Sequence, residues 1–505
     1  MHYKTIHIAQ IILKFEQFNT QDMKTISELQ PSALWRIFSD ICQVPRPSKR
    51  EGKIIAFLQK FGQEHNLETL TDKTGNVLIR KPATAGYESH PAIVLQAHMD
   101  MVCEKNNDTI HNFDTDPIQP YIDGEWVRAR GTTLGADNGI GMAAALAVLV
   151  SDEVKHGPLE CLFTVDEETG LTGAFALESG FMHGDMLINL DSEDDGEFFI
   201  GCAGGIDTTA VLHYTPTPAP AGYFGFRITV KGLTGGHSGD DIEKGRGNAN
   251  KLLTRFLWQT AHETDLALAS FNGGNLRNAI AREATAVAAV PMAYKETLRV
   301  KLNQFAADVE AELAATEPNI VFDLESAALP EQFIDKTSSE RLINALYACP
   351  HGVLRMCDDM PGLVETSTNL AAVKMRDDNE ILITTSQRSS VESSKYDAAR
   401  MVESVFVLAG ATVTHGDGYP GWKPNPNSPL AQLTAATYER LFGQKAKIRA
   451  IHAGLECGLF SKKYPHLDMV SVGPTMRGVH SPDERLNIAD TEKFWKLLVA
   501  VLEAL

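Results

Sequence analysis

The stretch Pro91-Ala-Ile-Val-Leu-Gln-Ala-His98-Met99-Asp100 decides how the rest of the chain is interpreted. This apolar run is too short for a typical helix and is bounded by a proline, so it predicts a buried strand of a mostly parallel sheet. Ligands of open α/β sheets bind at the carboxyl ends of strands, which is where His98 and Asp100 stand. Alternation along an extended chain puts both side chains on one side, so one can bind a metal while the other supports it. On this stretch alone, a core histidine beside a turn aspartate is an equally good interpretation.

Two further apolar segments also end in carboxylates. Residues 159–165 lead into Asp166-Glu167-Glu168-Thr-Gly, and residues 186–190 lead into Asp191. Successive acids in a buried site repel one another unless cations or protons intervene, whereas an exposed cluster is an ordinary solvated loop. The recurrence of histidine or acid at the ends of predicted strands is hard to attribute to loop composition. It predicts that these side chains share one site.

A glycine-rich turn precedes another apolar segment. It runs Arg130-Gly-Thr-Thr-Leu-Gly135-Ala-Asp137-Asn-Gly139 and leads into a predicted buried helix over residues 140–150. The glycines favour a tight loop at a helix N-terminus, where Asp137 is presented with little crowding. Asp-Asn-Gly is also ordinary turn chemistry, so the turn alone does not establish a metal ligand. An EF-hand is excluded, because its alternating acids and distal glutamate are missing.

Length and composition limit the class of protein. At 505 residues the chain exceeds what one hydrophobic core usually supports, which predicts two domains or one domain interrupted by another. The apolar and charged fractions, 43% and 22%, are typical of a soluble globular protein. The net charge of -19 argues against nucleic acid or an anionic membrane as a partner, because both would be repelled. The seven cysteines lack CxxC spacing, which suits reduced thiols in a cytoplasm.

No secretory or membrane-spanning segment is predicted. Residues 6–15 are fairly apolar, but Lys14 interrupts the run and no small-residue cleavage site follows. Met23 is an alternative start, which would leave residues 1–22 as an extension. Residues 142–150 are too short to span a bilayer. We therefore expect a cytoplasmic protein.

Motifs spread along most of the chain carry a family resemblance. They are His98-Met-Asp100, Gly135-Ala-Asp137-Asn-Gly, Asp166-Glu-Glu-Thr-Gly, Asn189-Leu-Asp191-Ser-Glu-Asp and Gly478-Val-His480-Ser-Pro-Asp. In this order they resemble the motif set of the M20 family of co-catalytic metallopeptidases. Within that family the chain is most similar to the cytosolic aminoacyl-histidine dipeptidases, on the basis of its length and of segments such as Ala450-Ile-His-Ala-Gly-Leu-Glu456-Cys-Gly.

The resemblance implies a role for each matching residue. His98, Asp137 and Asp191 would hold one metal ion, and Asp137 would bridge to a second ion completed by Glu168 and His480. Asp100 would orient His98 and raise its basicity as a ligand. Glu167 would be the general base. Imidazole and carboxylate ligands with a bridging acid suit zinc, with cobalt or manganese as alternatives.

The resemblance also implies the fold class and the domains. We expect an α/β protein, in which a zinc-peptidase-like catalytic domain with a mixed, mainly parallel sheet is interrupted by an inserted two-part α/β lid. The expected parts are residues 24–205 and 416–505 for the catalytic domain and residues 206–415 for the lid. Strand-then-helix order recurs in both halves of the lid, with strands over 226–231, 280–290, 381–386 and 411–414, and helices over 303–315 and 396–408. The proline-rich residues 418–429 would return the chain to the catalytic domain.

Four residues beyond the motifs are expected to contact substrate. His237, in Gly-Gly-His237-Ser-Gly, would polarise the scissile carbonyl, although it could also be a surface loop histidine. This loop lacks the Gly-Lys-Ser/Thr of a phosphate-binding loop. Arg388 would grasp the substrate carboxylate as a bidentate fork, and a solvated edge arginine is the alternative. Asn278 and Glu456 resemble further substrate-binding positions.

The expected function is metal-dependent hydrolysis of dipeptides, with Xaa-His substrates preferred. An M20 deacylase or a dipeptidase of broad specificity is the alternative that uses the same metals and base. A metal-stabilised binding protein without catalysis would need the site without its base, and the presence of Glu167 argues against it. We expect two divalent ions per subunit, small dipeptide substrates and a homodimer, and neither nucleic acid nor a membrane as a partner.

Overall fold

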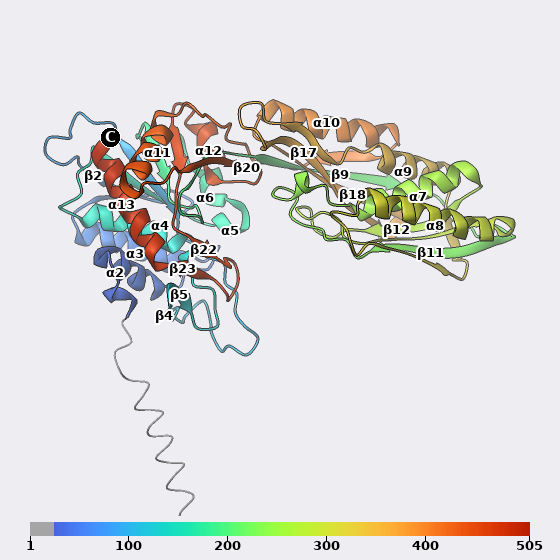
Figure 1. Ribbon diagram of the computed structural model, residues 1–505, viewed down its shortest axis with the longest axis horizontal. Coiled ribbons are helices and arrows are strands. Elements are labelled where there is room, and N and C mark those ends of the chain that lie inside the picture. Colours follow the sequence, from blue (N-terminus) through green and yellow to red (C-terminus); the bar gives the residue numbers. More distant parts are fainter. Residues whose placement is uncertain (1–24) are drawn as a thin grey trace, which may run out of the picture. The chain divides into compact units, whose positions relative to one another are not determined.

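The computed structural model describes residues 25–505, which form two compact units (Figure 1). Unit 1 comprises the described residues up to Ile200 together with Pro426–Arg449 and Lys463–Leu505, and unit 2 comprises Gly201–Asn425 and Ala450–Lys462. The alternative start at Met23 and the extension before it lie outside the described residues. These units divide the chain after residues 200 and 425, whereas the expected domain boundaries lie after 205 and 415, and residues 450–462 belong to unit 2.

Unit 1 is built on an eight-stranded mixed sheet. Its strands, in spatial order, are β1 (Glu68–Thr71), β2 (Val77–Lys81), β6 (Leu159–Thr164), β3 (Ile93–His98), β7 (Met186–Asn189), β21 (Asp468–Ser471), β8 (Glu197–Cys202) and β20 (Lys447–Ile451). The central strands β6, β3, β7 and β21 pair in parallel, and β1, β2 and β6 pair antiparallel. Every residue of β3 and β6 is buried, as expected for apolar runs in a sheet covered on both faces.

Helices cover this sheet, and unit 1 also contains a separate four-stranded sheet. The helices are α2 (Ser32–Cys42), α3 (Gly52–Glu64), α4 (Ala136–Val150), α5 (Glu167–Gly170), α6 (Thr172–Ala176), α11 (Pro429–Phe442) and α13 (Ile488–Ala504), after a short 3-10 helix over Ile26–Glu28. Helix α4 is buried along nearly its whole length, between α2 and β3, which explains its almost uninterrupted apolar sequence. The small sheet has the order β22 (Met476–Arg477), β23 (Arg485–Asn487), β5 (Trp126–Ala129) and β4 (Pro120–Asp123).

Unit 2 contains a nine-stranded antiparallel sheet with helices packed against it (Figure 1). Its strands are β14 (Val321–Ser326), β11 (Tyr223–Lys231), β13 (Ala284–Pro291), β12 (Ala267–Gly273), β17 (Val364–Arg376), β18 (Glu380–Ser389), β9 (Gly204–His213) and β19 (Thr412–His415), with β16 (Gly352–Met356) paired to β17. The helices are α7 (Ala249–Glu263), α8 (Lys295–Glu312), α9 (Lys336–Ala348) and α10 (Glu392–Leu408), and α12 (Glu456–Lys463) follows β20. Strands β10 (Pro216–Pro218) and β15 (Gln332–Ile334) form a separate pair. Short 3-10 helices occupy Ile242–Lys244, Met292–Tyr294 and Asp377–Asn379.

Two predicted elements of unit 2 have different bounds in the structure. Strand β13 begins at Ala284 and not at 280, because the backbone N–H of Ile280 donates to Gly236 and the carbonyl of Ala281 accepts from Ala249. These contacts hold the segment against the His237 loop and the start of α7. Helix α8 begins eight residues before the expected position 303, since its buried apolar stripe already starts at Leu298.

The architecture agrees with the expected fold class. Unit 1 has a mixed sheet with a parallel centre, and unit 2 is a separate α/β unit with an antiparallel sheet built from two parts of the chain. Strands β11–β14 and helices α7 and α8 come from one half of the inserted chain, and β16–β19 with α9 and α10 from the other. The halves meet where Gly273 of β12 pairs with Val373 of β17. Within the described residues, no helix is both long and apolar enough to cross a membrane.

Candidate metal centre and substrate residues

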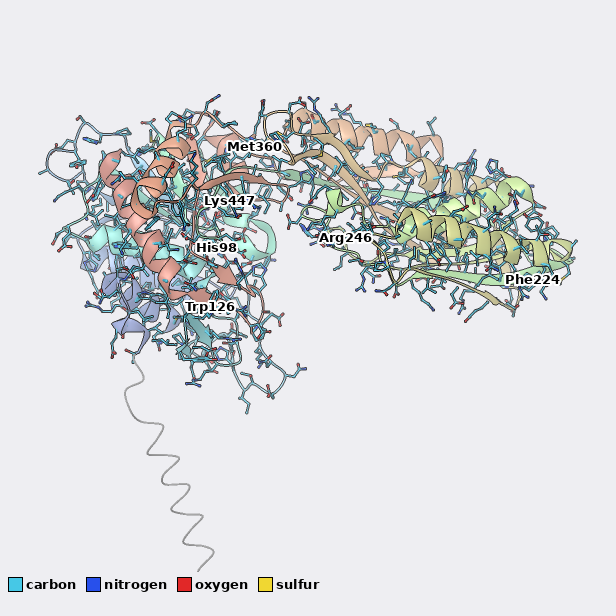
Figure 2. The ribbon with its side chains drawn as sticks, in the orientation of Figure 1. His98, Trp126, Phe224, Arg246, Met360 and Lys447 are labelled. Atoms are coloured by element: carbon cyan, nitrogen blue, oxygen red, sulfur yellow. The ribbon has the colours of Figure 1, made fainter. Side chains whose placement is uncertain are left out.

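The predicted metal ligands all come from unit 1, and three of them lie at the carboxyl ends of its central strands. His98 is the last residue of β3 (Figure 2), Glu168 follows β6 in α5, and Asp191 lies just after β7. Asp137 belongs to the turn at the start of α4, where its backbone is not helical. His480 lies in the loop between β22 and β23, and its φ of 61° is left-handed. The strand-end pattern in the sequence therefore corresponds to one cluster.

The two oxygens of Asp137 face two different histidines. Oδ1 lies 3.1 Å from Nε2 of His98, which in turn lies 3.5 Å from Oδ1 of Asp191. Oδ2 lies 3.1 Å from Nε2 of His480, which lies 3.0 Å from Oε2 of Glu168. Asp137 is thus shared by two groups of side chains, as a bridging carboxylate would be.

The charges at this cluster shift the pKa values of its members strongly. Burial opposes protonation of His98, but Asp191, Asp100 and Asp137 together raise its pKa well above the ordinary value. Hydrogen bonds to Asp137 and Glu168 raise the pKa of His480 to about 11. Burial would raise the pKa of Asp137, yet its contacts with His480 and His98 hold it far below the usual range. Positive charge near these carboxylates therefore stabilises the cluster, and either protons or metal ions can supply it.

The donor set fits a pair of divalent metal ions. His98, Asp137 and Glu168 each offer one ligand atom within 4.8 Å of the others. Oε1 of Glu168 is buried and has no hydrogen-bond partner among the described residues, which is costly unless a cation satisfies it. Imidazole nitrogens and carboxylate oxygens suit borderline ions such as zinc, cobalt and manganese.

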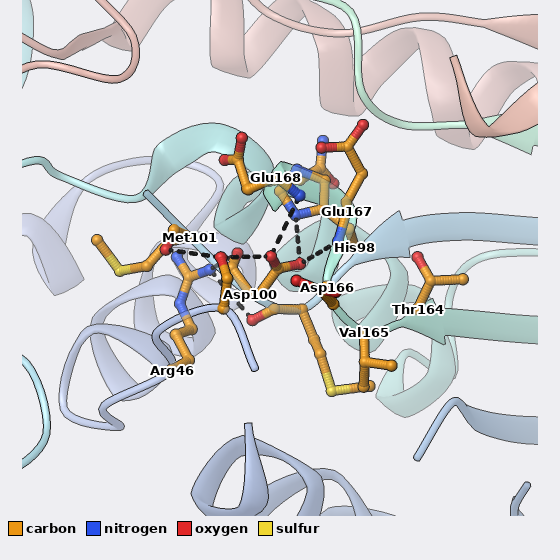
Figure 3. A network of polar contacts seen from close by, with 12 residues as sticks. Arg46, His98, Asp100, Met101, Thr164, Val165, Asp166, Glu167 and Glu168 are labelled. Carbon is orange, nitrogen blue, oxygen red and sulfur yellow. Dashed lines mark hydrogen bonds and ion pairs between the residues drawn. The ribbon is translucent and has the colours of Figure 1, made fainter. Parts of the chain in front are cut away.

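Asp100 contacts the imidazole of His98 and the backbone of Glu167 and Glu168 (Figure 3). Its Oδ1 lies 3.3 Å from Nδ1 of His98, and the hydroxyl of Ser48 donates to Oδ2 over 2.7 Å. The backbone N–H groups of Glu167 and Glu168 also donate to this carboxylate, over 3.0 and 3.3 Å. Burial opposes ionisation, but these contacts lower the pKa of Asp100. Asp100 is therefore an anion that orients His98 and the first turn of α5 together.

Glu167 and Glu168 lie on a helical turn and not on a continuation of strand β6. They form the first turn of the short helix α5, after Asp166 adopts a left-handed φ of 50°. The side chains of Thr169 and Thr172 donate to Asp166, and this contact closes the turn. The turn forms because Asp100 accepts from both N–H groups, which no local pattern in the sequence indicates.

The predicted substrate residues lie in unit 2, where two of the four are neighbours. His237 and Asn278 are neighbours, because His237 forms a β-bridge with Ala279 and the N–H of Ser238 donates to the carbonyl of Asn278 over 2.8 Å. Arg388 lies on β18 and is only 7% exposed. Its Nη1 donates to the hydroxyl of Tyr419 over 2.9 Å, and its Nε has no hydrogen-bond partner among the described residues. Glu456 is buried at the start of α12.

Sequence reasoning missed His452, a buried neighbour of Arg388. Nε2 of His452 lies 2.8 Å from the hydroxyl of Ser367, and Ser367 pairs with Arg388 across β17 and β18. Burial lowers the pKa of His452 to about 3, and the charge of Arg388 acts in the same direction. Asp240, whose carboxylate lies 3.4 Å from Nδ1 of His237, was also missed. The segment 450–458 was noted for its resemblance, but nothing in it marks the histidine as buried.

Comparison with known proteins places the chain in a family. Residues 94–504 match the model of peptidase family M20/M25/M40. The chain is 50% identical over 481 residues to the cytosol non-specific dipeptidase of Escherichia coli, covering 95% of this chain and 99% of the relative.

Solved structures agree with this placement. The crystal structure of aminoacylhistidine dipeptidase from Vibrio alginolyticus superposes with a TM-score of 0.91 at 48% identity, covering 95% of this chain and 98% of that one. A tripeptidase from Staphylococcus aureus matches with a TM-score of 0.55 at 16% identity over 94% of this chain and 98% of that one, and so shares the fold. The motifs, the architecture and the matched length lead to one conclusion: the chain belongs to peptidase family M20/M25/M40 and is a metal-dependent enzyme.

Proposed function

We propose that this M20 peptidase is a dipeptidase that hydrolyses Xaa-His and related dipeptides with the aid of two divalent metal ions. The observation that carries the proposal is the placement of His98 and His480 on opposite oxygens of Asp137. The names of the two most similar proteins described above, a non-specific dipeptidase and an aminoacylhistidine dipeptidase, support the reaction and its substrate class.

The proposed ligands fall into two groups that share Asp137. His98 and Asp191 would hold one ion, and Glu168 and His480 the other. Zinc is the proposed metal, with cobalt or manganese as alternatives. When bound, the ions would polarise the scissile carbonyl and lower the pKa of a water molecule.

Glu167 is the proposed general base. Its backbone is fixed by the hydrogen bond to Asp100, and the adjacent Glu168 faces His480. Glu167 would accept a proton from the attacking water and deliver it to the leaving amine, as one carboxylate can do in both steps. Asp100 would keep His98 in the orientation and tautomer that a ligand needs.

Unit 2 would supply the groups that recognise and polarise the substrate. Arg388 would bind the free α-carboxylate, since a buried guanidinium with an unpartnered Nε is a ready donor for an anion. His237 would donate to the oxyanion of the transition state, with Asn278 beside it. Glu456 is proposed as a further substrate-binding residue. A site that requires a free carboxylate next to the scissile bond would exclude cleavage in the interior of a longer chain, which an endopeptidase performs.

Two other functions differ from this proposal in testable ways. A deacylase or a dipeptidase of broad specificity would use the same metal centre, and the name of the E. coli relative supports broad specificity in particular. A binding protein without catalysis would not need a general base, so the presence of Glu167 argues against this alternative. A cytoplasmic location is supported by the cytosol dipeptidase among the relatives and by the seven cysteines, which form no disulfide within the described residues. Small dipeptides are the proposed partners, and a homodimer the proposed assembly.

The decisive experiment is a substrate panel on the purified, metal-stripped protein. Carnosine, other Xaa-His dipeptides, dipeptides without histidine and N-acetyl amino acids would each be incubated after addition of zinc, cobalt or manganese. We expect hydrolysis of dipeptides only with metal, and the highest kcat/KM for Xaa-His. Faster turnover of N-acetyl amino acids than of dipeptides would show that the enzyme is a deacylase. Equal turnover of all dipeptides would show that it is a non-specific dipeptidase.

A further inference from the structure

Glu484 is a buried carboxylate that the proposed reaction does not use. It is 2% exposed and lies directly before β23, which fixes its backbone in the small sheet. A carboxylate is rarely buried to this extent unless its oxygens are fully hydrogen-bonded. The contacts of Glu484 therefore indicate what it is held for.

Within residues 25–505, the hydrogen bonds to the Glu484 carboxylate come from the turn that carries Asp137. Oε2 accepts from the backbone N–H of Leu134 over 2.7 Å and of Gly135 over 3.0 Å. Oε1 accepts from Ala136 over 2.7 Å and from Asp137 itself over 3.3 Å. Four successive N–H groups thus converge on one anion, and this arrangement defines the backbone of the turn residue by residue.

Arg46 holds the same turn from its other side. Its Nη2 donates to the carbonyl of Gly135, and its Nη1 donates to the carbonyls of Asp100 and Met99 over 2.7 and 3.3 Å. The guanidinium is buried, and its charge interacts with that of Glu484. Arg46 therefore ties the end of β3, where His98 stands, to the turn where Asp137 stands.

The space around Gly135 is limited by this arrangement. Gly135 has a left-handed φ of 67°, and a Cβ added there would lie 2.5 Å from Nη2 of Arg46. Only glycine fits both the backbone conformation and the close approach of the guanidinium. The sequence Leu134-Gly135-Ala136-Asp137 is thus shaped to be held between Arg46 and Glu484.

We propose that Glu484 is a positioning residue that, together with Arg46, sets the bridging carboxylate of Asp137 between His98 and His480. The inference rests on the proposed metal centre. Glu484 follows His480 by four residues in one loop, so a single carboxylate fixes both the loop of one ligand and the turn of another. Because Asp137 is shared, a displaced turn would alter both metal positions at once. Groups that orient ligands in this way typically change metal affinity by ~10–100-fold when removed.

Glu484→Gln is the informative substitution. The amide keeps the size of the side chain. Its NH₂ group, however, cannot accept hydrogen bonds, so it cannot replace the carboxylate oxygen that now accepts two of them from backbone N–H groups. The matched control is Glu160→Gln. Glu160 is also buried in unit 1, where Oε2 accepts from the N–H groups of His183 and Gly184 and Oε1 accepts from Arg80, at the opposite end of β6 from Glu168. Both variants should lose stability, and only the first should perturb the metal centre.

The test measures metal binding directly and does not depend on turnover. Wild type and variants would be stripped, titrated with Co²⁺, and followed by visible absorption and by metal content after dialysis. We expect Glu484→Gln to bind Co²⁺ ~10–100-fold more weakly with an altered absorption spectrum, and Glu160→Gln to match wild type. Arg46→Lys retains the charge but loses the forked guanidinium that joins Gly135 to Asp100. It should weaken Co²⁺ binding as Glu484→Gln does, and it replaces that variant in the test if Glu484→Gln does not fold.

The outcomes separate the inference from the proposed function. Wild-type affinity and spectrum in a folded Glu484→Gln or Arg46→Lys variant would overturn the positioning role while leaving the metal centre intact. Equal weakening in Glu160→Gln would show that loss of stability alone is responsible, and would overturn it too. Failure of the wild-type protein to bind Co²⁺ would overturn the proposed centre itself.

Discussion

Nε2 of His480 lies 3.1 Å from Oδ2 of Asp137, although 343 positions of sequence separate the two residues. The contact joins the turn at the start of α4 to the loop between β22 and β23. It gives Asp137 a second imidazole on the oxygen that does not face His98. The proposed division of ligands into two groups follows from this relationship.

Substitution of single histidines tests that division. His480→Ala and His98→Ala should each remove mainly one ion, whereas Asp137→Ala should remove both, because only Asp137 is shared. All three should lose activity. Metal content per chain after dialysis measures the effect, with His183→Ala as an exposed histidine control in unit 1. Normal metal content in all three variants would contradict the ligand assignment.

The adjacent acids Glu167 and Glu168 should behave differently. Glu167→Gln should keep both metal ions and substrate affinity while kcat falls by ~10²–10⁴, because an amide cannot accept the proton of the attacking water. Glu168→Gln should instead lose metal, since its carboxylate faces His480. Metal analysis and turnover on both purified variants decide the roles. A metal-depleted or fully active Glu167→Gln enzyme would reverse the assignment.

His237 should affect turnover more than binding. If it donates to the oxyanion, His237→Ala should lower kcat by about a hundredfold or more with a smaller change in KM. Steady-state kinetics on an Xaa-His dipeptide provides the measurement, and His262→Ala, in α7 of the same unit, is the control. Wild-type kcat in His237→Ala would remove this residue from the mechanism.

Arg388 should confer discrimination against substrates with a blocked C-terminus. Amidation of the dipeptide removes the charge that the guanidinium would pair with, at a cost of a few kcal/mol when the pair is desolvated. Wild type should therefore strongly prefer the acid to the amide, and Arg388→Ala should not. The ratio of kcat/KM for the two substrates is the readout, with the exposed Arg355→Ala as control. Undiminished discrimination in Arg388→Ala would assign carboxylate recognition to another group, such as the region of Gly454 and Glu456.

His452 predicts an acid-sensitive contribution to stability. Its folded pKa is about 3, against 6.5 when exposed, so below pH 6.5 the unfolded chain binds a proton that the folded chain does not. Stability is therefore lost as the pH falls through this window, by about 2 kcal/mol between pH 6.5 and pH 5.

Urea unfolding of the full chain at pH 7 and pH 5 measures this contribution. His452→Gln, which cannot titrate, should lose less stability on acidification than wild type does. His213→Gln, at an exposed histidine of the same unit, should lose as much as wild type. An identical pH dependence in wild type and His452→Gln would show that this imidazole does not remain neutral.

The sequence by itself determined the strands and the candidate ligands at their ends. Residues 93–98 and 159–164 are continuous apolar runs, and such runs form buried parallel strands whose carboxyl ends meet at one edge. His98, Glu168 and Asp191 could be placed together for this reason. Asp137 and His480 needed the family resemblance in addition, because a glycine turn and a late loop have no periodicity that locates them.

Only the tertiary structure decided which groups hold these ligands in place. The helical turn of Glu167 and Glu168 depends on Asp100, and the turn of Asp137 depends on Arg46 and Glu484, which are distant in sequence. The burial of His452 beside Arg388 likewise arises where 450–462 joins unit 2. Side-chain to backbone hydrogen bonds of this kind leave no periodic pattern in the sequence. They depend on segments that only the packing of the whole chain brings within about 3 Å of one another.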